Sequence, residues 1–187
     1  MKEQFTKIYQ EERWGKGRGS GVGSSLLYNK KYIQFLENFL KENNIKSVID
    51  YGCGDWQFSQ HINWGDIDYL GLDIVDSVIE KNQIKFPNYS FVSDTDVFKH
   101  LDGKELIIIK DVLMHWPNDE IINFLDKLIK IDILIFLVNS AYHKNQPTER
   151  KIKIGGWSPL EYDKFPLNKY NTNLIFRYRN RQVVLIK

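Results

Sequence analysis

The sequence predicts an α/β fold: a three-layer, doubly wound, mostly parallel sheet of seven strands that ends in an antiparallel hairpin. Short apolar segments alternate with helical patterns between residues 47 and 139, which is typical of a parallel sheet with helices on both faces. The segment 106–110 (LIIIK) is almost entirely apolar, as expected for a strand buried on both faces. Two β-rich segments, 173–178 and 182–187, flank Arg179-Asn180-Arg181. Asparagine tolerates the left-handed turn conformation, so this spacing predicts the closing hairpin.

The elements follow one another in a regular order from the N-terminus. Residues 1–28 combine aromatic and basic side chains with a small-residue stretch, which predicts a short helix and a flexible arm. Apolar residues three and four positions apart predict a helix from Asn29 to about Asn43. The remaining core elements are expected as strands at 47–51, 69–74, 88–92, 106–110 and 133–139, with helices at 56–62, 75–85 and 117–130.

The length of 187 residues predicts a single domain, since domains average roughly 100–200 residues. Within it we expect an arm that forms a lid at 1–28, a cofactor-binding core at 29–139, an acceptor-site loop at 140–172 and the hairpin at 173–187. The loop is mostly polar and contains proline and glycine. A loop of this length inside a compact domain is uncommon and usually functional.

Composition excludes several classes of protein. The 26 basic and 24 acidic side chains nearly cancel to +2, so no strong field favours nucleic acid or an anionic membrane. No apolar segment approaches the roughly 20 residues of a membrane span, and the N-terminus lacks the apolar segment of a secretion signal. A single cysteine, Cys53, excludes an internal disulfide and a cysteine-rich zinc site, and no two of the four histidines have metal-ligand spacing. We expect a cytoplasmic monomer or homodimer without a metal, a nucleic-acid partner or a membrane partner.

The stretch 48–56 (VIDYGCGDW) contains the main candidate site. Two glycines, Gly52 and Gly54, follow a buried strand and let the backbone approach a ligand closely. Asp50 lies near the end of that strand, and Asp73 closes the next one. In open α/β sheets ligands bind at the carboxyl ends of strands, where an acid can accept both ribose hydroxyls. A dinucleotide fingerprint is disfavoured, because Gln57 stands where its third glycine belongs and Asp50 would repel a phosphate.

These residues resemble the class I S-adenosylmethionine (AdoMet)-dependent methyltransferases, whose first motif is an acid, any residue, and G-x-G. The resemblance covers about residues 45–139 and the terminal hairpin, and includes Asp73 and the S-D-T at 93–95. It implies a Rossmann-like methyltransferase fold, with AdoMet as cofactor and S-adenosylhomocysteine as product. By this resemblance Asp50 and the backbone of Gly52 and Gly54 hold the methionine part, while Asp73 holds the ribose. The full implied cofactor set is Trp14, Ser24, Ser25, Asp50, Gly52, Gly54, Asp73, Ile74, Asp94, Thr95 and Lys110, with Asp94 and Thr95 bordering the adenine.

A second resemblance follows the fourth strand, where residues 110–116 read KDVLMHW. This is similar to the R-D-x-L-x-H of some small bacterial methyltransferases. The same enzymes carry a downstream G-x-W-x-P-L, here residues 155–160, and an N-terminal tryptophan before a serine- and glycine-rich arm, here Trp14 and residues 20–25. The chain departs from the pattern at Lys110, at Ser158 and by one extra residue before His115. These departures leave the acceptor open.

His115 and Asp111 are the predicted catalytic residues. Methyl transfer is an in-line displacement at a sulfonium, and a hydroxyl acceptor must lose its proton as the bond forms. A positioned base supplies about 10²–10⁴ in rate, and histidine titrates near neutrality. The alternative is a histidine that only packs against Trp116. The N-P-P-Y or D-P-P-Y motif of amino-methylating DNA enzymes does not occur at residues 110–113.

Six side chains in the arm and the long loop are the predicted acceptor-binding set. Arginine recognises carboxylate or phosphate through a two-pronged fork, which indicates an anionic acceptor. The three arginines of the hairpin are instead expected on a solvated face. The predicted set is Arg13, Arg18, Tyr142, His143, Arg150 and Trp157. We therefore expect an AdoMet-dependent methyltransferase that acts on an oxygen of an anionic or sugar-derived small molecule; the alternative is a non-catalytic methyltransferase-fold module that binds AdoMet or a partner.

Overall fold

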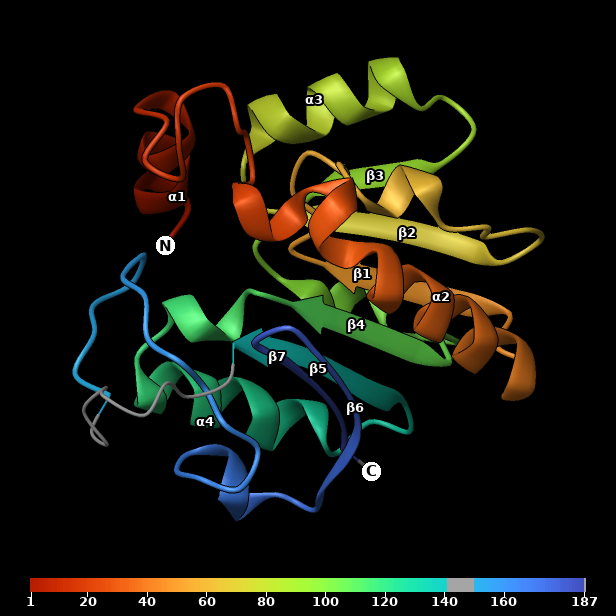
Figure 1. Cartoon of the computed structure of the whole chain (residues 1–187), viewed down its shortest axis with the longest axis vertical. Helices are drawn as coiled ribbons and strands as arrows, with labels where there is room; N and C mark the ends of the chain where they lie inside the picture. Colours follow the sequence, from red (N-terminus) through yellow and green to blue (C-terminus); the bar gives the residue numbers. More distant parts are fainter. Residues whose placement is uncertain (141–149, 187) are drawn as a thin grey trace. The chain divides into compact units, whose positions relative to one another are not determined.

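The computed structural model describes residues 1–140 and 150–186. The chain divides into two compact units, Met1–Lys104 and Glu105–Lys187, whose elements are coloured along the sequence in Figure 1. The strands are mostly parallel and end in an antiparallel hairpin, which confirms the predicted fold class. Among the described residues no helix is both long and apolar enough to span a bilayer.

The first unit contains three parallel strands in the order β3-β2-β1. Their bounds are Ser47–Tyr51 for β1, Asp68–Asp73 for β2 and Ser90–Ser93 for β3. All residues of β1 are buried. Gly71 of β2 lies so close to its neighbours that a Cβ would approach Phe91 to 2.7 Å and Cys53 Sγ to 3.1 Å. Because parallel strands end at the same edge of a sheet, the ends of β1 and β2 bring the glycine turn next to Asp73.

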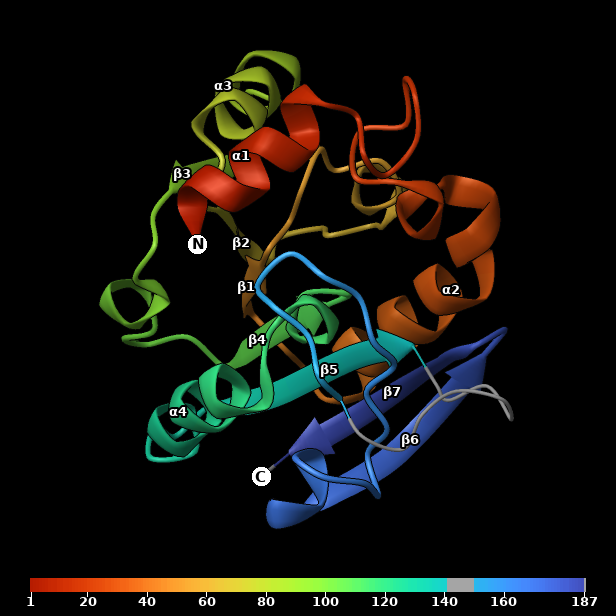
Figure 2. The same ribbon diagram turned by 90° about the vertical axis from the view of Figure 1, so that its left-hand side faces the viewer.

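Three helices belong to this unit: α1 (Lys2–Gln10), α2 (Leu26–Glu42) and α3 (Asp76–Lys85). Helix α3 packs on β2 and β3. Figure 2 shows α1 beside α3, where Lys2 Nζ lies 2.7 Å from Asp76 Oδ1. Helix α2 begins at Leu26, before the predicted start at Asn29, because the buried Asn29 amide donates to the Gly23 and Ser25 carbonyls at 2.7 and 2.8 Å.

The predicted helix at 56–62 is wrong; only a short 3₁₀ turn, η2 (Ser59–His61), forms there. Two further 3₁₀ turns of the unit are η1 (Val22–Ser24) and η3 (Val97–His100). Trp56 has φ +57°, a left-handed conformation that does not continue into a helix. Its indole is buried among aromatic rings, with the centroids of Phe86 and Tyr89 both 4.6 Å away.

The second unit contains four strands in the order β4-β5-β7-β6. They are β4 (Leu106–Lys110), β5 (Leu134–Ser140), β6 (Thr172–Tyr178) and β7 (Arg181–Ile186). Strand β4 is parallel to β5, whereas β7 is antiparallel to both β5 and β6. The helical elements are α4 (Asn118–Leu128) and the 3₁₀ turns η4 (Leu113–His115) and η5 (Leu167–Lys169). Pro117 directly precedes α4, and the helix buries an apolar face that includes Ile121 and Leu125.

The hairpin corrects two expectations. The residue in the left-handed region is Arg179, with φ +48°, while the Asn180 side chain accepts a hydrogen bond from Arg181 Nη1 at 2.8 Å. Arg181 is buried, which contradicts the predicted solvated face for this residue. The physical reason is an ion pair with Asp111, which compensates the guanidinium for its lost hydration.

Candidate functional site

The glycine turn after β1 joins the ends of two neighbouring strands. Gly52 and Gly54 have φ values of +76° and +56°, the left-handed region that favours glycine. The backbone N–H groups of Gly52 and Cys53 both donate to the Leu72 carbonyl of β2, at 2.7 and 3.0 Å. Cys53 is buried, and this burial raises the pKa of its thiol. Gly52 and Gly54 themselves carry no side chain, so at these two positions a ligand can approach the backbone closely.

Asp73 is fixed directly to this turn. Its Oδ2 accepts the Gly54 N–H at 3.1 Å, and its Oδ1 accepts the Val75 N–H at 3.0 Å. Burial raises the pKa of Asp73, and the N–H groups of Val75, Gly54 and Ile74 partly counteract that rise. Each carboxylate oxygen has more than one acceptor site, so both keep capacity for a further donor. The chemistry of these groups fits the paired hydroxyls of a ribose, as in AdoMet.

Asp50 takes part in an internal hydrogen-bond chain. Its Oδ2 accepts the Tyr69 hydroxyl at 2.8 Å, and the Tyr69 oxygen in turn accepts the Trp56 indole N–H at 2.6 Å. Burial, followed by the charge of Asp50, raises the pKa of Tyr69, so its hydroxyl stays protonated and donates. This carboxylate oxygen therefore links β1 to the aromatic cluster. Sequence reasoning assigned Asp50 to the methionine part and did not find these two partners.

The loop after β3 holds the two residues predicted to border the adenine. The Asp94 N–H donates to the Asp73 carbonyl at 3.3 Å, so this loop is tied to the end of β2. The pKa of Asp94 is lowered by the Asp96 N–H, which donates to Oδ1 at 2.9 Å, and by His100, whose Nε2 lies 3.1 Å from Oδ2. Thr95 is exposed.

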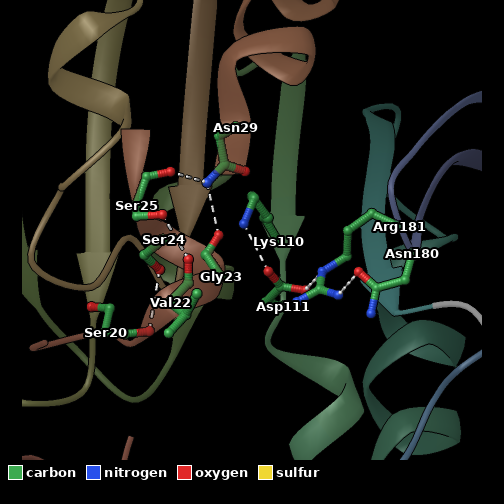
Figure 3. A network of polar contacts seen from close by, with 10 residues as sticks. All are labelled: Ser20, Val22, Gly23, Ser24, Ser25, Asn29, Lys110, Asp111, Asn180 and Arg181. Carbon is green, nitrogen blue, oxygen red and sulfur yellow. Dashed lines mark hydrogen bonds and ion pairs between the residues drawn. The ribbon is translucent and has the colours of Figure 1, made fainter. Parts of the chain in front are cut away.

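The three arm residues of the predicted cofactor set contact the arm itself. The Ser24 hydroxyl donates to the Ser20 carbonyl at 3.2 Å, and the Ser25 hydroxyl donates to the Val22 carbonyl at 2.9 Å (Figure 3). The Trp14 ring packs edge-on against Tyr9, with centroids 5.1 Å apart. These contacts shape the arm, and they leave the direct cofactor contacts of these residues as predictions.

Sequence reasoning missed Tyr9 and Ser20. The Tyr9 phenol oxygen lies 2.7 Å from the Ser20 hydroxyl, within the same unit as the glycine turn. Burial and then the charge of Asp73 raise the pKa of Tyr9, which places the phenol in the electrostatic field of the predicted ribose-binding acid. A lone tyrosine in a short helix carries no sequence signal for such a position.

In the second unit Asp111 lies against two cations (Figure 3). Lys110 Nζ donates to its Oδ2 at 2.7 Å, and Arg181 Nε lies 2.7 Å from Oδ1 as an ion pair, without the alignment of a hydrogen bond. Burial acts to raise the pKa of Asp111, but the charges of Lys110 and Arg181 outweigh it and the pKa is lowered. Asp111 is therefore an ionised carboxylate that is a poor proton acceptor. Lys110 was predicted to bind the cofactor, and in the structure its ammonium group is hydrogen-bonded to Asp111.

His115 ends η4 and contacts the G-x-W-x-P-L segment. Its Nδ1 lies 2.6 Å from the Gly156 carbonyl oxygen. Because a carbonyl only accepts hydrogen bonds, Nδ1 carries the proton, and in the neutral ring Nε2 carries the lone pair. The segment is held further by the Gly155 N–H, which donates to the His115 carbonyl at 3.0 Å. Trp116 packs edge-on against Phe124, with ring centroids 5.3 Å apart.

The partly buried position of His115 predicts a measurable titration. Burial lowers the pKa of the imidazole, while the Gly156 carbonyl and Asp111 oppose this effect. We expect an NMR titration of the His115 Cε1–H, assigned with His115→Asn, to have its midpoint below the ordinary value of about 6.5. Because the unfolded state then binds the proton more readily, the stabilising contribution is fully present above about pH 6.5 and is lost as the pH falls. A midpoint at or above the ordinary value would contradict this assignment.

The predicted acceptor residues have different surroundings. Arg150 donates to the Asn118 side chain at 2.6 Å and to the Trp116 carbonyl at 3.1 Å, and burial lowers its pKa to about 10. Arg13 pairs with Glu11 at 2.6 Å. Arg18 and Trp157 are exposed, whereas Tyr142 and His143 lie outside the described residues. Two of the three arginines are thus engaged by the protein.

The fold is that of the class I AdoMet-dependent methyltransferases. At a TM-score of 0.65 and 16% identity, the structure is similar to magnesium protoporphyrin IX methyltransferase of Synechocystis PCC 6803 with bound SAM (AdoMet), over 100% of this chain and 96% of that chain. The methyltransferase domain of bacterial CtHen1-CN gives the same score and identity over 85% of this chain and 98% of its own.

In sequence, the chain is 28% identical over 116 residues to phosphoethanolamine N-methyltransferase 1 of Zea mays. The match covers 57% of this chain and 23% of that relative, so the chain spans less than a quarter of its length. No known protein-family model matches the chain. Within residues 1–140 and 150–186, no group of three or more histidine, cysteine, aspartate or glutamate side chains could hold a metal ion.

Proposed function

We propose that this protein is an AdoMet-dependent methyltransferase that transfers a methyl group to an oxygen of a small molecule. The observation that carries the proposal is the buried Asp73 carboxylate, which accepts the N–H of Gly54 in the glycine turn at the ends of two parallel strands. Because the Arg150 guanidinium is engaged by Asn118 and the Trp116 carbonyl, we take a sugar-derived acceptor as the first candidate and an anionic one as the second.

In the proposed mechanism Asp73 and the glycine turn bind the cofactor, and His115 is the proton acceptor. Bound AdoMet would supply an activated methyl group on a sulfonium. Asp73 accepts the ribose hydroxyls, and the turn of Gly52 and Gly54 lets the backbone contact the methionine part. His115 Nε2 takes the proton of the acceptor hydroxyl. The Gly156 carbonyl, bonded to Nδ1–H, and the negative charge of Asp111 stabilise the imidazolium that results.

The cofactor assignment is tested at Asp73. Hydrogen bonds to a charged group contribute about 1.5–3 kcal/mol each, so Asp73→Ala is expected to weaken AdoMet binding roughly tenfold or more in calorimetry. Asp76→Ala is the matched control, because this nearby carboxylate is exposed and pairs with Lys2. Since Asp73 also accepts the Gly54 and Val75 N–H groups, circular dichroism must show a folded variant. If folded Asp73→Ala binds AdoMet as tightly as the wild type, the assignment of Asp73 to the ribose is wrong.

The acceptor class is tested separately by a screen. Sugars and sugar derivatives are compared with carboxylated and phosphorylated metabolites, and the release of S-adenosylhomocysteine is measured. We expect turnover with a hydroxyl-bearing sugar derivative. Binding of AdoMet without transfer to any compound would favour the non-catalytic module instead.

A further inference from the structure

Ser20 joins the N-terminal arm to the segment that follows the glycine turn. Its hydroxyl lies 2.7 Å from the Tyr9 phenol and accepts the Asp55 backbone N–H at 2.9 Å, while its own N–H donates to Asp55 Oδ2 at 3.3 Å. Gln57 Nε2 donates to the Arg18 carbonyl at 2.7 Å and to Asp55 Oδ2 at 2.8 Å. We call Tyr9, Ser20, Asp55 and Gln57 the Ser20 latch.

Gly54 contacts both the latch and Asp73. A Cβ on Gly54 would overlap the Ser20 hydroxyl and would lie 3.1 Å from the Tyr9 phenol oxygen. The Gly54 N–H donates to Asp73 Oδ2, and its carbonyl accepts the Asn82 amide at 2.7 Å. The same residue therefore packs against the arm and holds the predicted ribose-binding acid, so a movement of the arm changes the surroundings of that hydrogen bond.

The arm is rich in glycine, so few contacts of its own side chains hold it in one conformation. Residues 15–23 contain five glycines, and Gly15, Gly17, Gly19 and Gly21 all have positive φ. Such a segment has much conformational entropy to lose and few large side chains to compensate for it. The order of the arm therefore depends on its hydrogen bonds, and the Ser20 latch supplies those that join it to the segment after the glycine turn.

We infer that Ser20 is a positioning residue of the AdoMet site, an inference that rests on the proposed function. Through the latch, the arm and the Gly54 turn become ordered together, and the turn keeps its N–H on Asp73 when the cofactor binds. Coupling of this kind is reciprocal: if an ordered arm tightens cofactor binding by some factor, the cofactor stabilises the ordered arm by the same factor.

The test uses the full chain with S-adenosylhomocysteine as probe. Ser20→Ala removes the hydroxyl partner of Tyr9 and of the Asp55 N–H, and each lost hydrogen bond corresponds to several-fold in an equilibrium constant, so we expect about tenfold weaker binding. Ser20→Thr keeps a hydroxyl and is expected to restore affinity to within about threefold. Without ligand, amide hydrogen exchange is expected to be faster in Ser20→Ala than in the wild type, both at residues 15–24 and at residues 52–57. Addition of S-adenosylhomocysteine is expected to slow exchange in the arm, and to slow it more in the wild type than in Ser20→Ala.

A double-mutant cycle and a control separate the latch from general destabilisation. If Ser20 and Asp55 act through one latch, Ser20→Ala combined with Asp55→Ala will weaken binding by less than the product of the two single effects. Ser77→Ala, at an exposed serine of α3, is the matched control and is expected to bind like the wild type. If Ser20→Ala does not fold, Tyr9→Phe replaces it in the test. This variant removes only the phenol hydroxyl, so a smaller loss of affinity for the probe is expected.

The outcomes are distinct. If the wild type binds the probe and folded Ser20→Ala binds equally well, Ser20 is not a positioning residue. The same conclusion follows if exchange accelerates in the arm but not at residues 52–57. If the wild type itself does not bind the probe, the proposed function fails, and the role of Ser20 fails with it.

Discussion

Replacing Asp111 with alanine is expected to lower the free energy of unfolding by about 3–5 kcal/mol, the usual cost of removing one partner of a buried ion pair. Asp111 lies 2.7 Å from both Lys110 and Arg181, whose side chains are only 4% and 10% exposed. Both cations would lose a carboxylate that compensates for their lost hydration. Urea denaturation at neutral pH measures the change, and a loss below about 1 kcal/mol would show that the pairs contribute little.

Two comparisons sharpen this result. Asp111 has φ +58°, so Asp111→Gly relieves a backbone strain that Asp111→Ala retains, and glycine is expected to be the more stable of the two by about 1 kcal/mol. The lowered pKa of Asp111 also sets a pH dependence. The stabilisation is fully present above the unfolded value of about 3.9 and is lost as the pH falls through the folded value below it. In Asp111→Ala, the decrease in unfolding free energy that comes from protonation of Asp111 at low pH should be absent.

His115→Asn is expected to reduce turnover by about 10²–10⁴, while AdoMet affinity stays nearly unchanged. The reason is the fixed tautomer: Nδ1–H is bonded to Gly156, so the proton of the acceptor goes to Nε2. Because burial lowers the pKa of His115, the neutral base is already formed at neutral pH. The wild-type rate should rise with pH only below about 6.5 and then stay constant.

The matched control is His61→Asn, at an exposed histidine of η2. It is expected to keep the wild-type turnover and pH profile. Single-turnover measurements with the acceptor found by the screen separate chemistry from product release. Full turnover in His115→Asn would mean that His115 is structural and that orientation of the reactants alone drives the reaction.

Much of the fold was predictable, because it depends on the pattern of burial along the chain. Strand β4 occupies the predicted residues 106–110, and its almost entirely apolar sequence leaves no exposed face to mislead the assignment. The position of the glycine turn near Asp73 also follows from sequence, since both come at the ends of adjacent parallel strands, but the hydrogen bond between Gly54 and Asp73 was not predicted. The short helix at 56–62 failed because aromatic packing of Trp56 overrides local helical spacing.

The partners of the polar groups were less predictable, because they depend on register and on contacts between distant residues. Arg181 pairs with Asp111 only because β7 aligns Arg181 with Ser140 at the end of β5, the strand beside β4. Composition places an arginine in a hairpin turn on the solvated side. Arg150 likewise lies in a loop where an arginine was predicted to bind an anion. In the structure it donates instead to the Trp116 carbonyl and to the Asn118 side chain, which lie far from it in sequence.

The hydrogen bond between Trp56 and Tyr69 has an optical consequence. The chain contains five tryptophans, and Trp56, which is 2% exposed, lies just after the glycine turn and between the latch residues Asp55 and Gln57. The emission of an indole depends on the polarity of its surroundings and on the acceptor of its N–H hydrogen bond. Here that acceptor is the Tyr69 hydroxyl oxygen, and the same hydroxyl donates to Asp50. A rearrangement at Gly54 or Asp50 therefore reaches a buried chromophore through one or two bonded groups. We therefore expect the emission of Trp56 to change when a ligand binds at the proposed cofactor turn, so that titrations need no attached dye.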